Sequence, residues 1–498
     1  MFSNTSTLAA RLADEGGWTD TAAVIDERTG DIQRHRDVHA RAGELADEFL
    51  GRGIGPGDHV GFLVGDRPEW MPVFLALHAI GAVPLVVNPD LAEHTQSRML
   101  GILPTKFVIS YRDGALYIEG RESRPPAVHH EHGGGPEVSR YYLYSSGTTG
   151  IPKAVAHTSL DLPFFHDAVG GTNGLDIQAT DTIVSLSQYY FTYGFNNQFV
   201  YPLFSGASVV LSRQRRDEKT FVDSLHQYGA TLAFSVPSAL AKLADHVESA
   251  AVERPAALRA VVSAGEPLPD AVAARLEDRW QVPVLNQIGS TEVGNAFCAN
   301  GVTRRATGTA GFVCPGYAVQ LRSDSGRPLP TVGSEQEVGA VWVTGPTIPR
   351  HAVTVNGTEE LLVDGWLETK DIGYWADNGG LVVVGRTDDF VHAGGISMSA
   401  VEIESAIRSC AGVEDCAVLA PLVDGVSTLS ALVVMNPSTG EPEESLAALR
   451  TQLRRHLDPF RVPKQWTPVP EIPRTGSGKI MRHKLTSVLI DGEPGVIR

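Results

Sequence analysis

Short apolar runs alternate with helical patterns between residues 58 and 289, and this alternation limits the choice of fold more than any other feature. DHVGFLVGD at residues 58–66 predicts a buried strand, residues 68–82 predict a helix, and VPLVVNP at residues 83–89 predicts a second strand. Apolar strands joined through helices are typical of a parallel sheet that is covered on both faces. The alternation recurs in DTIVSLS, ASVVLS, TLAFSV, LRAVVSAG and PVLNQIG, with helical patterns such as PSALAKLADHVESA between them. We therefore expect doubly wound sheets.

The pattern changes twice beyond this region. Helical periodicity stops between residues 308 and 385, where GAVWVTGP, GWLETKDIGYW and GLVVVGR predict short strands with glycine and aspartate turns. Further on, AVEIESAIRS and ESLAALRTQLRRHL predict helices, and CAVLAPL and STLSALVVM predict strands. The expected fold is α/β. A large N-terminal domain of doubly wound sheets plus a small β-barrel subdomain (residues 1–385) is followed by a small, mobile α+β C-terminal domain (residues 386–498).

Composition excludes several classes of function. The 498 residues include 41 Lys and Arg against 58 Asp and Glu, which gives a formal net charge of −17. A chain this acidic lacks the basic surface that binds nucleic acid or anionic lipid. No apolar stretch approaches the ~18 residues that span a bilayer, and the first residues show no signal-peptide pattern. We expect a cytoplasmic protein that has neither nucleic acid nor a membrane as a partner. The four cysteines form no CxxC pair, so they predict neither a disulfide framework nor a zinc site.

The strongest chemical motif is YYLYSSGTTGIPKAV at residues 141–155, where an apolar strand runs into a loop of small residues. Glycines let backbone N–H groups approach an anion closely and hydroxyls add donors, so the loop suits the phosphates of a nucleotide. It is not a Walker A loop, which needs GxxxxGK followed by Ser or Thr. The residues that would form this site are Ser145, Ser146, Gly147, Thr148, Thr149, Gly150 and Lys153.

Further motifs follow in a fixed order. SAGEPLP (residues 263–269) and NQIGSTEVGN (residues 286–295) each follow an apolar strand, which is where doubly wound sheets bind ligands. ETKDIGYW, GRTDDFVHAGGISMSAVEIE and PRTGSGKIMR come later, the last at residues 473–482. The ordered set resembles the adenylate-forming ligase superfamily, which includes acyl- and aryl-CoA synthetases, peptide-synthetase adenylation domains and luciferases. The resemblance covers nearly the whole chain.

This resemblance implies a reaction in which a carboxylic acid and ATP form an acyl-adenylate. The Ser145–Lys153 loop would hold the β- and γ-phosphates, Thr291 would contact the α-phosphate, and Glu292 would help to hold Mg²⁺. For the rest of the nucleotide, the resemblance assigns Gly265, Glu266, Pro267 and Asn286 to adenine, and Asp371 with Arg386 to ribose. Lys479 would reach from the small domain to the reacting carboxylate, and Asp388 matches the hinge about which that domain swings. Each of three residues has a structural alternative when it is taken singly. Glu292 would cap a helix, Asp371 would lie in a turn, and Lys479 would be a surface charge.

The wording of YSSGTTGIPKAVAH, YYFTYGFNN and LNQIGSTE is similar to aryl-CoA ligases, particularly benzoate-CoA ligase. The family's acid pocket maps onto Ala168, Phe191, Thr192, Tyr193, Ala264, Gly289, Gly294 and Asn295. An aromatic wall with glycines opposite would make a flat slot, which suits a benzoate-like ring. Core packing is the alternative for Tyr189, Tyr190, Phe191 and Tyr193.

The sequence indicates the acceptor of the acyl group less directly than it indicates the acid. The resemblance assigns Gly394, Gly395, Phe460 and Arg461 to binding the acceptor, and CoA is the expected co-substrate. His392 falls where benzoate-type ligases carry a lysine associated with the thioester step, so an amine or the thiol of a carrier protein stays open as the acceptor. A remote alternative is a non-catalytic homologue that binds an acyl group or a nucleotide.

Overall fold

A computed structural model gives the fold as two compact units, each with its own hydrophobic core. The larger unit consists of Met1–Ser145, Pro152–Thr369 and Gly373–Val383, and the smaller unit of Ser146–Ile151, Lys370–Ile372 and Val384–Arg498. The structure describes residues 19–121, 139–146, 152–214, 216–323, 325–330, 337–387, 390–393, 396–423, 426–436, 442–454, 457, 461–474, 480–482 and 485.

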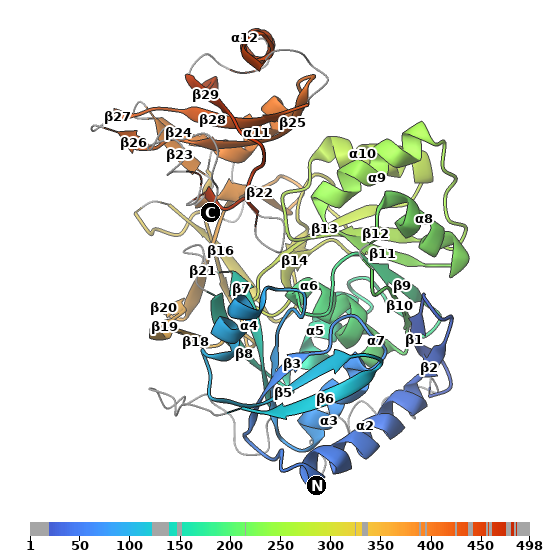
Figure 1. Ribbon diagram of the computed structural model, residues 1–498. Helices are drawn as coiled ribbons and strands as arrows, with labels where there is room; N and C mark the ends of the chain where they lie inside the picture. The colour runs from blue at the N-terminus through green and yellow to red at the C-terminus, as the bar shows by residue number, and fades with distance from the viewer. Residues whose placement is uncertain are drawn as a thin grey trace. The chain divides into compact units, whose positions relative to one another are not determined.

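The larger unit contains a nine-stranded sheet with the strand order β15-β14-β13-β12-β11-β9-β10-β1-β2 (Figure 1). Every neighbouring pair from β13 to β1 is parallel, so the predicted parallel arrangement is confirmed. The strands are β1 (Ala22–Asp26), β2 (Ile32–Arg34), β9 (Thr182–Ser185), β10 (Ser208–Leu211), β11 (Leu232–Ser235), β12 (Ala260–Ser263), β13 (Val284–Gly289), β14 (Ala296–Ala299) and β15 (Phe312–Val313).

Both faces of this sheet are buried, as the alternating side chains of β9 show. Ile183 on β9 belongs to the main core, whereas its neighbour Val184 packs with a second cluster of buried residues. Helices α8 (Glu218–Gln227), α9 (Pro237–Ser249) and α10 (Asp270–Trp280) supply that second cluster with Phe221, Leu240 and Trp280. Because neighbouring side chains on a strand point to opposite faces, a strand covered on both sides must be apolar throughout.

An eight-stranded sheet forms the other half of the larger unit, in the order β19-β18-β8-β7-β4-β3-β5-β6. The strands are β3 (His59–Leu63), β4 (Val83–Val86), β5 (Thr105–Arg112), β6 (Ala115–Gly120), β7 (Arg140–Ser146), β8 (Pro152–Thr158), β18 (His351–Thr354) and β19 (Gly357–Glu360). Helices α2 (His35–Gly51) and α3 (Trp70–Ala79) pack together in its core, and α4 (Glu93–Leu100) covers another part.

Short helices before β9 and between β9 and β10 carry residues of the predicted acid pocket. They are α5 (Asp161–Phe165), the π-helix η1 (His166–Gly170), α6 (Thr192–Phe195), the π-helix η2 (Asn196–Val200) and α7 (Tyr201–Ser205). Single turns of π-helix occur often at functional sites, where they redirect side chains. Here η1 carries Ala168 and η2 carries Asn196.

The predicted β-subdomain is present as a five-stranded sheet. Its strands are β16 (Ala318–Arg322), β17 (Gly339–Thr344), β20 (Leu362–Val363), β21 (Trp366–Trp375) and β22 (Leu381–Arg386). No helix occurs among the described residues between 308 and 385, as the sequence predicts. None of the helices in the described part of the chain is long and apolar enough to span a membrane.

The smaller unit is built on a three-stranded sheet of β25 (Val413–Leu419), β28 (Ser430–Met435) and β29 (Gln465–Pro468) (Figure 1). Helix α11 (Ala400–Arg408) packs on β25, and α12 (Pro442–Leu453) contacts α11. Two short hairpins complete it: β23 (Phe390–Ala393) with β24 (Ile396–Ser399), and β26 (Leu422–Val423) with β27 (Val426–Ser427). The α+β pattern read from the sequence is confirmed here.

The stability of the larger unit should depend strongly on Trp70. Its ring stacks on Tyr189 at 4.4 Å and on Phe74 at 5.0 Å between centroids, and its side chain is fully buried. We expect Trp70→Ala to lower the free energy of unfolding by about 3–5 kcal/mol because it leaves a cavity. Tyr117→Ala on β6, which is 40% exposed, is the control and should change it by about 0.5 kcal/mol or less. Urea unfolding followed by circular dichroism measures both, and equal losses would show that the stacked rings around Trp70 add no particular stability.

Candidate active site

Three segments of the predicted site begin where parallel strands of the nine-stranded sheet end. Phe191–Tyr193 come after β9, Ala264–Pro267 after β12, and the segment from Gly289 to Asn295 after β13. Ser263 on β12 pairs with Asn286 on β13, and Ser185 on β9 lies one register position earlier, since it pairs with Phe234 on β11. Carboxyl ends of parallel strands meet at the same edge, so the structure brings these segments together.

A hydrogen bond joins the predicted acid pocket to the predicted α-phosphate contact. The Thr192 hydroxyl donates to Oγ1 of Thr291 at 3.1 Å. Asn196 reinforces this link, since its Nδ2 donates to the carbonyls of Thr192 and Gly294, each at 2.8 Å. The Thr192 segment and the loop after β13 are therefore tied to one another from two points.

A buried histidine also fixes the loop after β13. His157 Nε2 lies 2.8 Å from the carbonyl of Thr291, and burial lowers the pKa of His157 to about 4. The ring is therefore neutral near pH 7, and its one N–H can donate to that carbonyl. Asp161, whose pKa burial raises to about 6, lies 3.9 Å from Nδ1 on the other side of the ring.

Asn295 and Tyr193, both predicted pocket residues, make buried hydrogen bonds. Asn295 accepts from the Tyr201 hydroxyl at 2.9 Å and donates to the carbonyl of Phe165 at 2.8 Å. Tyr193 donates its hydroxyl to the carbonyl of Val262 at 3.0 Å, and burial raises its pKa well above the ordinary value. The polar ends of both side chains are thus used to hold the pocket in shape.

Tyr189 belongs to the core, whereas its neighbours are only half-buried. Its ring is fully buried against Trp70, and its backbone N–H donates to Asp66 at 2.8 Å. Tyr190, Phe191 and Tyr193 are half-buried, and the rings of Tyr190 and Phe191 lie 4.8 Å apart. Core packing thus accounts for the first aromatic residue, and Tyr190 and Tyr193 also pack against the edge of the main core. Contact of Tyr190, Phe191 and Tyr193 with an acid stays a prediction.

Two pocket glycines are required by packing. A Cβ on Gly289 would lie 2.3 Å from the carbonyl oxygen of Asn295, and one on Gly294 would lie 2.3 Å from Phe165 Cζ. Gly289 also sits at a register shift between β13 and β14. Packing alone therefore requires glycine at both positions, and the flat slot expected from the sequence is not tested by these contacts. Their missing side chains would point into protein, and their contact with an acid stays a prediction.

One of the predicted adenine residues carries an unsatisfied acceptor. Asn286 Oδ1 is buried and has no hydrogen-bond partner among the described residues. Gly265 and Pro267 are exposed, and Glu266 accepts hydrogen bonds from the backbone and hydroxyl of Ser238 at 2.9 and 3.1 Å. A free acceptor beside an exposed segment fits the amino group of a purine.

The charged side chains differ in how they are paired. Lys153 Nζ lies 2.5 Å from Oε1 of Glu359 on β19. The half-buried Glu292 carboxylate makes no hydrogen bond or ion pair with any other described residue, so it is available to a cation. No group of three or more His, Cys, Asp or Glu side chains in the described part of the chain could hold a metal ion. One carboxylate with phosphate oxygens and water nevertheless fits the usual ligands of Mg²⁺.

In the smaller unit, the predicted ribose residues form an ion pair. Arg386 Nη1 donates to Asp371 Oδ1 at 3.2 Å, and Asp371 is buried. Arg461, predicted to bind the acceptor, pairs with Glu402 at 3.0 Å. Several predicted residues lie outside the described residues, and their roles stay predictions: Gly147, Thr148, Thr149, Gly150, Asp388, Gly394, Gly395, Phe460, Lys479, and the side chains of Ser146 and His392.

Sequence reasoning missed His157, Asn196 and Asp66. Asp66 follows β3 at the carboxyl end of a parallel strand, so the rule that found the other segments could have found it. Burial raises the pKa of Asp66 to about 7. Asn196 could have been noticed as a polar residue within an apolar helical run, but nothing in the sequence indicates that His157 contacts Thr291, which lies far along the chain.

Two protein-family models match the chain. The family model described as "AMP-binding enzyme" matches residues 14–351, and that of the "AMP-binding enzyme C-terminal domain" matches residues 402–479. A p-hydroxybenzoic acid–AMP ligase of Mycobacterium marinum is 31% identical over 97% of this chain and 69% of its own length. A benzoate–CoA ligase of Thauera aromatica is 30% identical over 87% of this chain and 86% of its own.

A crystal structure of the anthranilate CoA ligase AuaEII with anthranoyl-AMP has the same fold, with a TM-score of 0.80. It is 23% identical in sequence, and the match covers 99% of this chain and 98% of that chain. Fold and site together define an adenylate-forming ligase. The chain belongs to the AMP-binding enzyme family.

Gly294 and Gly265 offer a matched test of the packing described here. Both have positive φ, +82° and +92°, but a Cβ on Gly265 would meet nothing closer than 3.8 Å. Gly265→Ala should cost about 1–2 kcal/mol of stability, from backbone strain alone. Gly294→Ala adds a clash with Phe165 and His157 and should cost about 2–5 kcal/mol. Urea unfolding measures both, and an equal cost would show that Gly294 is not sterically confined.

Proposed function

We propose that this protein activates an aromatic carboxylic acid with ATP and then transfers the acyl group to the thiol of CoA. The observation that carries the proposal is the hydrogen bond from Thr192 to Thr291, which joins the aromatic segment to the proposed α-phosphate contact. An acid held by the first segment would have its carboxylate next to the phosphorus that it attacks. The names of the relatives support the aromatic class, since they include ligases of p-hydroxybenzoate and benzoate.

In the first step, a carboxylate oxygen attacks the α-phosphorus and the bond to pyrophosphate breaks, which leaves an acyl-adenylate. Negative charge spreads over the pentavalent phosphorus, so the protein must supply positive charge and hydrogen-bond donors there. We assign these to Thr291 and Lys479, with Lys153 and the Ser145–Gly150 segment on the leaving phosphates. One ammonium at ~4 Å contributes on the order of 4 kcal/mol at an effective dielectric near 20.

The rest of the nucleotide has candidate contacts in each unit. The free Oδ1 of Asn286 would accept from the adenine amino group, and the buried Asp371 would accept from the ribose hydroxyls while Arg386 holds it in place. Glu292 would hold Mg²⁺, which would neutralise phosphate charge when bound. Thr291, positioned by His157, would keep the α-phosphate in line with the acid.

In the second step, the thiol attacks the acyl carbonyl and AMP leaves. Two observations favour an alternative acceptor, which would be a carrier-protein thiol or an amine. The relative from Mycobacterium marinum is named an acid–AMP ligase, whereas others are named CoA ligases. His392 also stands where benzoate-type ligases carry a lysine linked to the thioester step.

We expect flat aromatic acids to support pyrophosphate release better than long alkyl acids. Tyr190, Phe191 and Tyr193 remain half-buried at the sheet edge, and ring burial against them contributes about 2–3 kcal/mol. Benzoate and 4-hydroxybenzoate should therefore exceed dodecanoate in kcat/KM by at least about tenfold. Cyclohexanecarboxylate, which has the ring size without the flatness, is the matched control and should fall between them. A higher kcat/KM for dodecanoate would remove the aromatic assignment.

The acceptor is tested separately with the acid that works best. Mass spectrometry after incubation with ATP and CoA should show the acyl-CoA thioester. The parallel reactions contain a phosphopantetheinylated carrier protein or a primary amine in place of CoA. An acylated carrier or an amide, with no thioester from CoA, would replace CoA by the alternative acceptor and leave the adenylation step intact.

A further inference from the structure

A carboxylate beside the eight-stranded sheet holds the start of the predicted aromatic segment. Asp66 follows β3 of that sheet, and its Oδ1 accepts the backbone N–H of Tyr189 at 2.8 Å. Tyr189 lies 123 positions later in the chain, after β9 of the nine-stranded sheet. The contact therefore joins the two sheets of the larger unit at the point where the segment Tyr190–Tyr193 begins.

The N–H group that Asp66 accepts belongs to a tight turn. The N–H of Phe191 donates to the carbonyl of Gln188 at 3.1 Å, which closes a turn over residues 188–191. That closing bond does not use the N–H of Tyr189, which needs an acceptor outside the turn. Asp66 supplies this acceptor and thereby fixes the peptide between Gln188 and Tyr189.

The turn is also in contact with helix α6, which carries Thr192 and Tyr193 of the predicted acid pocket. A Cβ on Gly194 of that helix would lie 2.0 Å from the carbonyl oxygen of Gln188, so the helix backbone lies directly on the turn. A shift of the turn would therefore displace residues of the predicted acid pocket.

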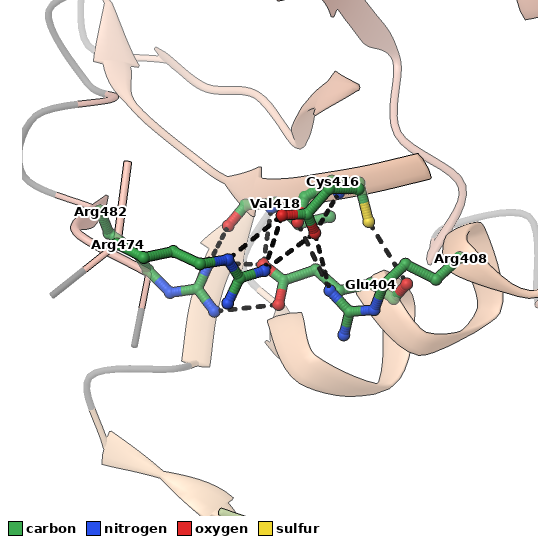
Figure 2. Close-up of polar contacts among 7 residues, drawn as sticks. Glu404, Arg408, Cys416, Val418, Arg474 and Arg482 are labelled. Atoms are coloured by element: carbon green, nitrogen blue, oxygen red, sulfur yellow. Dashed lines mark hydrogen bonds and ion pairs between the residues drawn. The ribbon is translucent and has the colours of Figure 1, made fainter. Parts of the chain in front are cut away.

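A carboxylate inside a protein usually has a cation beside it, and the smaller unit gives an example (Figure 2). Glu404 is 2% exposed there, and it accepts hydrogen bonds from Arg482 at 2.5 Å and from the N–H of Val418 at 2.8 Å. Asp66 is half-buried, yet it forms no ion pair with any other described residue. Within the described part of the chain, its hydrogen-bond donor is the N–H of Tyr189.

The surroundings of Asp66 disfavour its charged form. Burial raises its pKa to about 7; the N–H of Tyr189 and the charge of Arg216 act against this rise, and Asp90 adds to it. Arg216 is itself paired with Glu27 at 3.1 Å. A raised pKa means that the ionised carboxylate lowers stability at neutral pH, so stability gives no reason for a charge at this position.

We propose that Asp66 is a positioning residue whose carboxylate holds the turn at residues 188–191, so that Tyr190 and Phe191 present a fixed face to the acid. The inference rests on the proposed function, in which the acid lies against these rings. A charged acceptor makes a hydrogen bond roughly twice as strong as a neutral one, so a neutral group at position 66 holds the turn less firmly. Thr291 keeps its separate support from His157, so the contact with ATP should change little.

The test compares Asp66→Asn with the wild type in ATP–pyrophosphate exchange, with benzoate or 4-hydroxybenzoate, whichever reacts faster. Asparagine keeps an oxygen acceptor in the same place but removes the charge. At pH 8 we expect the KM for the acid to rise by about three- to tenfold and the KM for ATP to stay within about twofold. At pH 6 the wild-type carboxylate is mostly protonated, so the ratio of mutant to wild-type KM for the acid should fall to about two or less.

Stability gives the readout that separates positioning from a structural role. Because the folded protein disfavours ionised Asp66, Asp66→Asn should leave the midpoint of urea unfolding at pH 8 unchanged or raise it. Asp58→Asn is the matched control, since Asp58 lies at the other end of β3, is also half-buried and accepts the N–H of Gly55 at 2.9 Å. It should leave both KM values unchanged.

The outcomes distinguish the two proposals. A wild type that releases no pyrophosphate with any acid would overturn the proposed function. An active wild type whose KM for the acid is unchanged by Asp66→Asn at pH 8 would overturn only the inference. A variant that is less stable and loses affinity for ATP and the acid alike would do the same, because Asp66 would then act on the fold.

The pH dependence decides whether the charge of Asp66 is the cause. A KM ratio that stays constant between pH 8 and pH 6 would contradict the inference. Should Asp66→Asn not fold, the wild type alone provides the test, because its KM for the acid must rise from pH 8 to pH 6 while its KM for ATP does not. A wild-type KM for the acid that is constant over this range would also overturn the inference.

Discussion

The burial of the nine-stranded sheet on both faces is the constraint on which the site depends. Ile183 and Val184 face two separate clusters, so the middle of β9 is covered by apolar side chains on both faces. The polar side chains of β9, β11 and β12 lie at the ends of these strands. Because the central strands are parallel, their carboxyl ends share an edge, and the loops that follow β9, β12 and β13 are gathered there. The location of the chemistry is thus a consequence of the same burial that stabilises the larger unit.

Much of this architecture could be predicted because its causes are local. An apolar run such as residues 58–66 predicts a doubly covered strand by itself, and Asn286 or Thr291 can be placed near a ligand because a strand ends there. What could not be predicted depends on pairs far apart in the chain. His157 contacts the carbonyl of Thr291, and Asn196 reaches that of Gly294, yet no periodicity links their positions. The steric requirement for glycine at positions 289 and 294 could not be predicted for the same reason, since the atoms that exclude a Cβ come from Asn295, Phe165 and His157.

The larger unit fixes the loop that carries Thr291, the proposed α-phosphate contact, mainly with neutral groups. His157 is held neutral by burial, and the other supports of the Thr291 loop are the amide of Asn196 and the hydroxyl of Thr192. Neutral donors add no charge that would compete with Glu292 or with a phosphate. This arrangement leaves the charges of the substrates to be met by the few groups that face them, which is how a preorganised electrostatic site gains most from each donor.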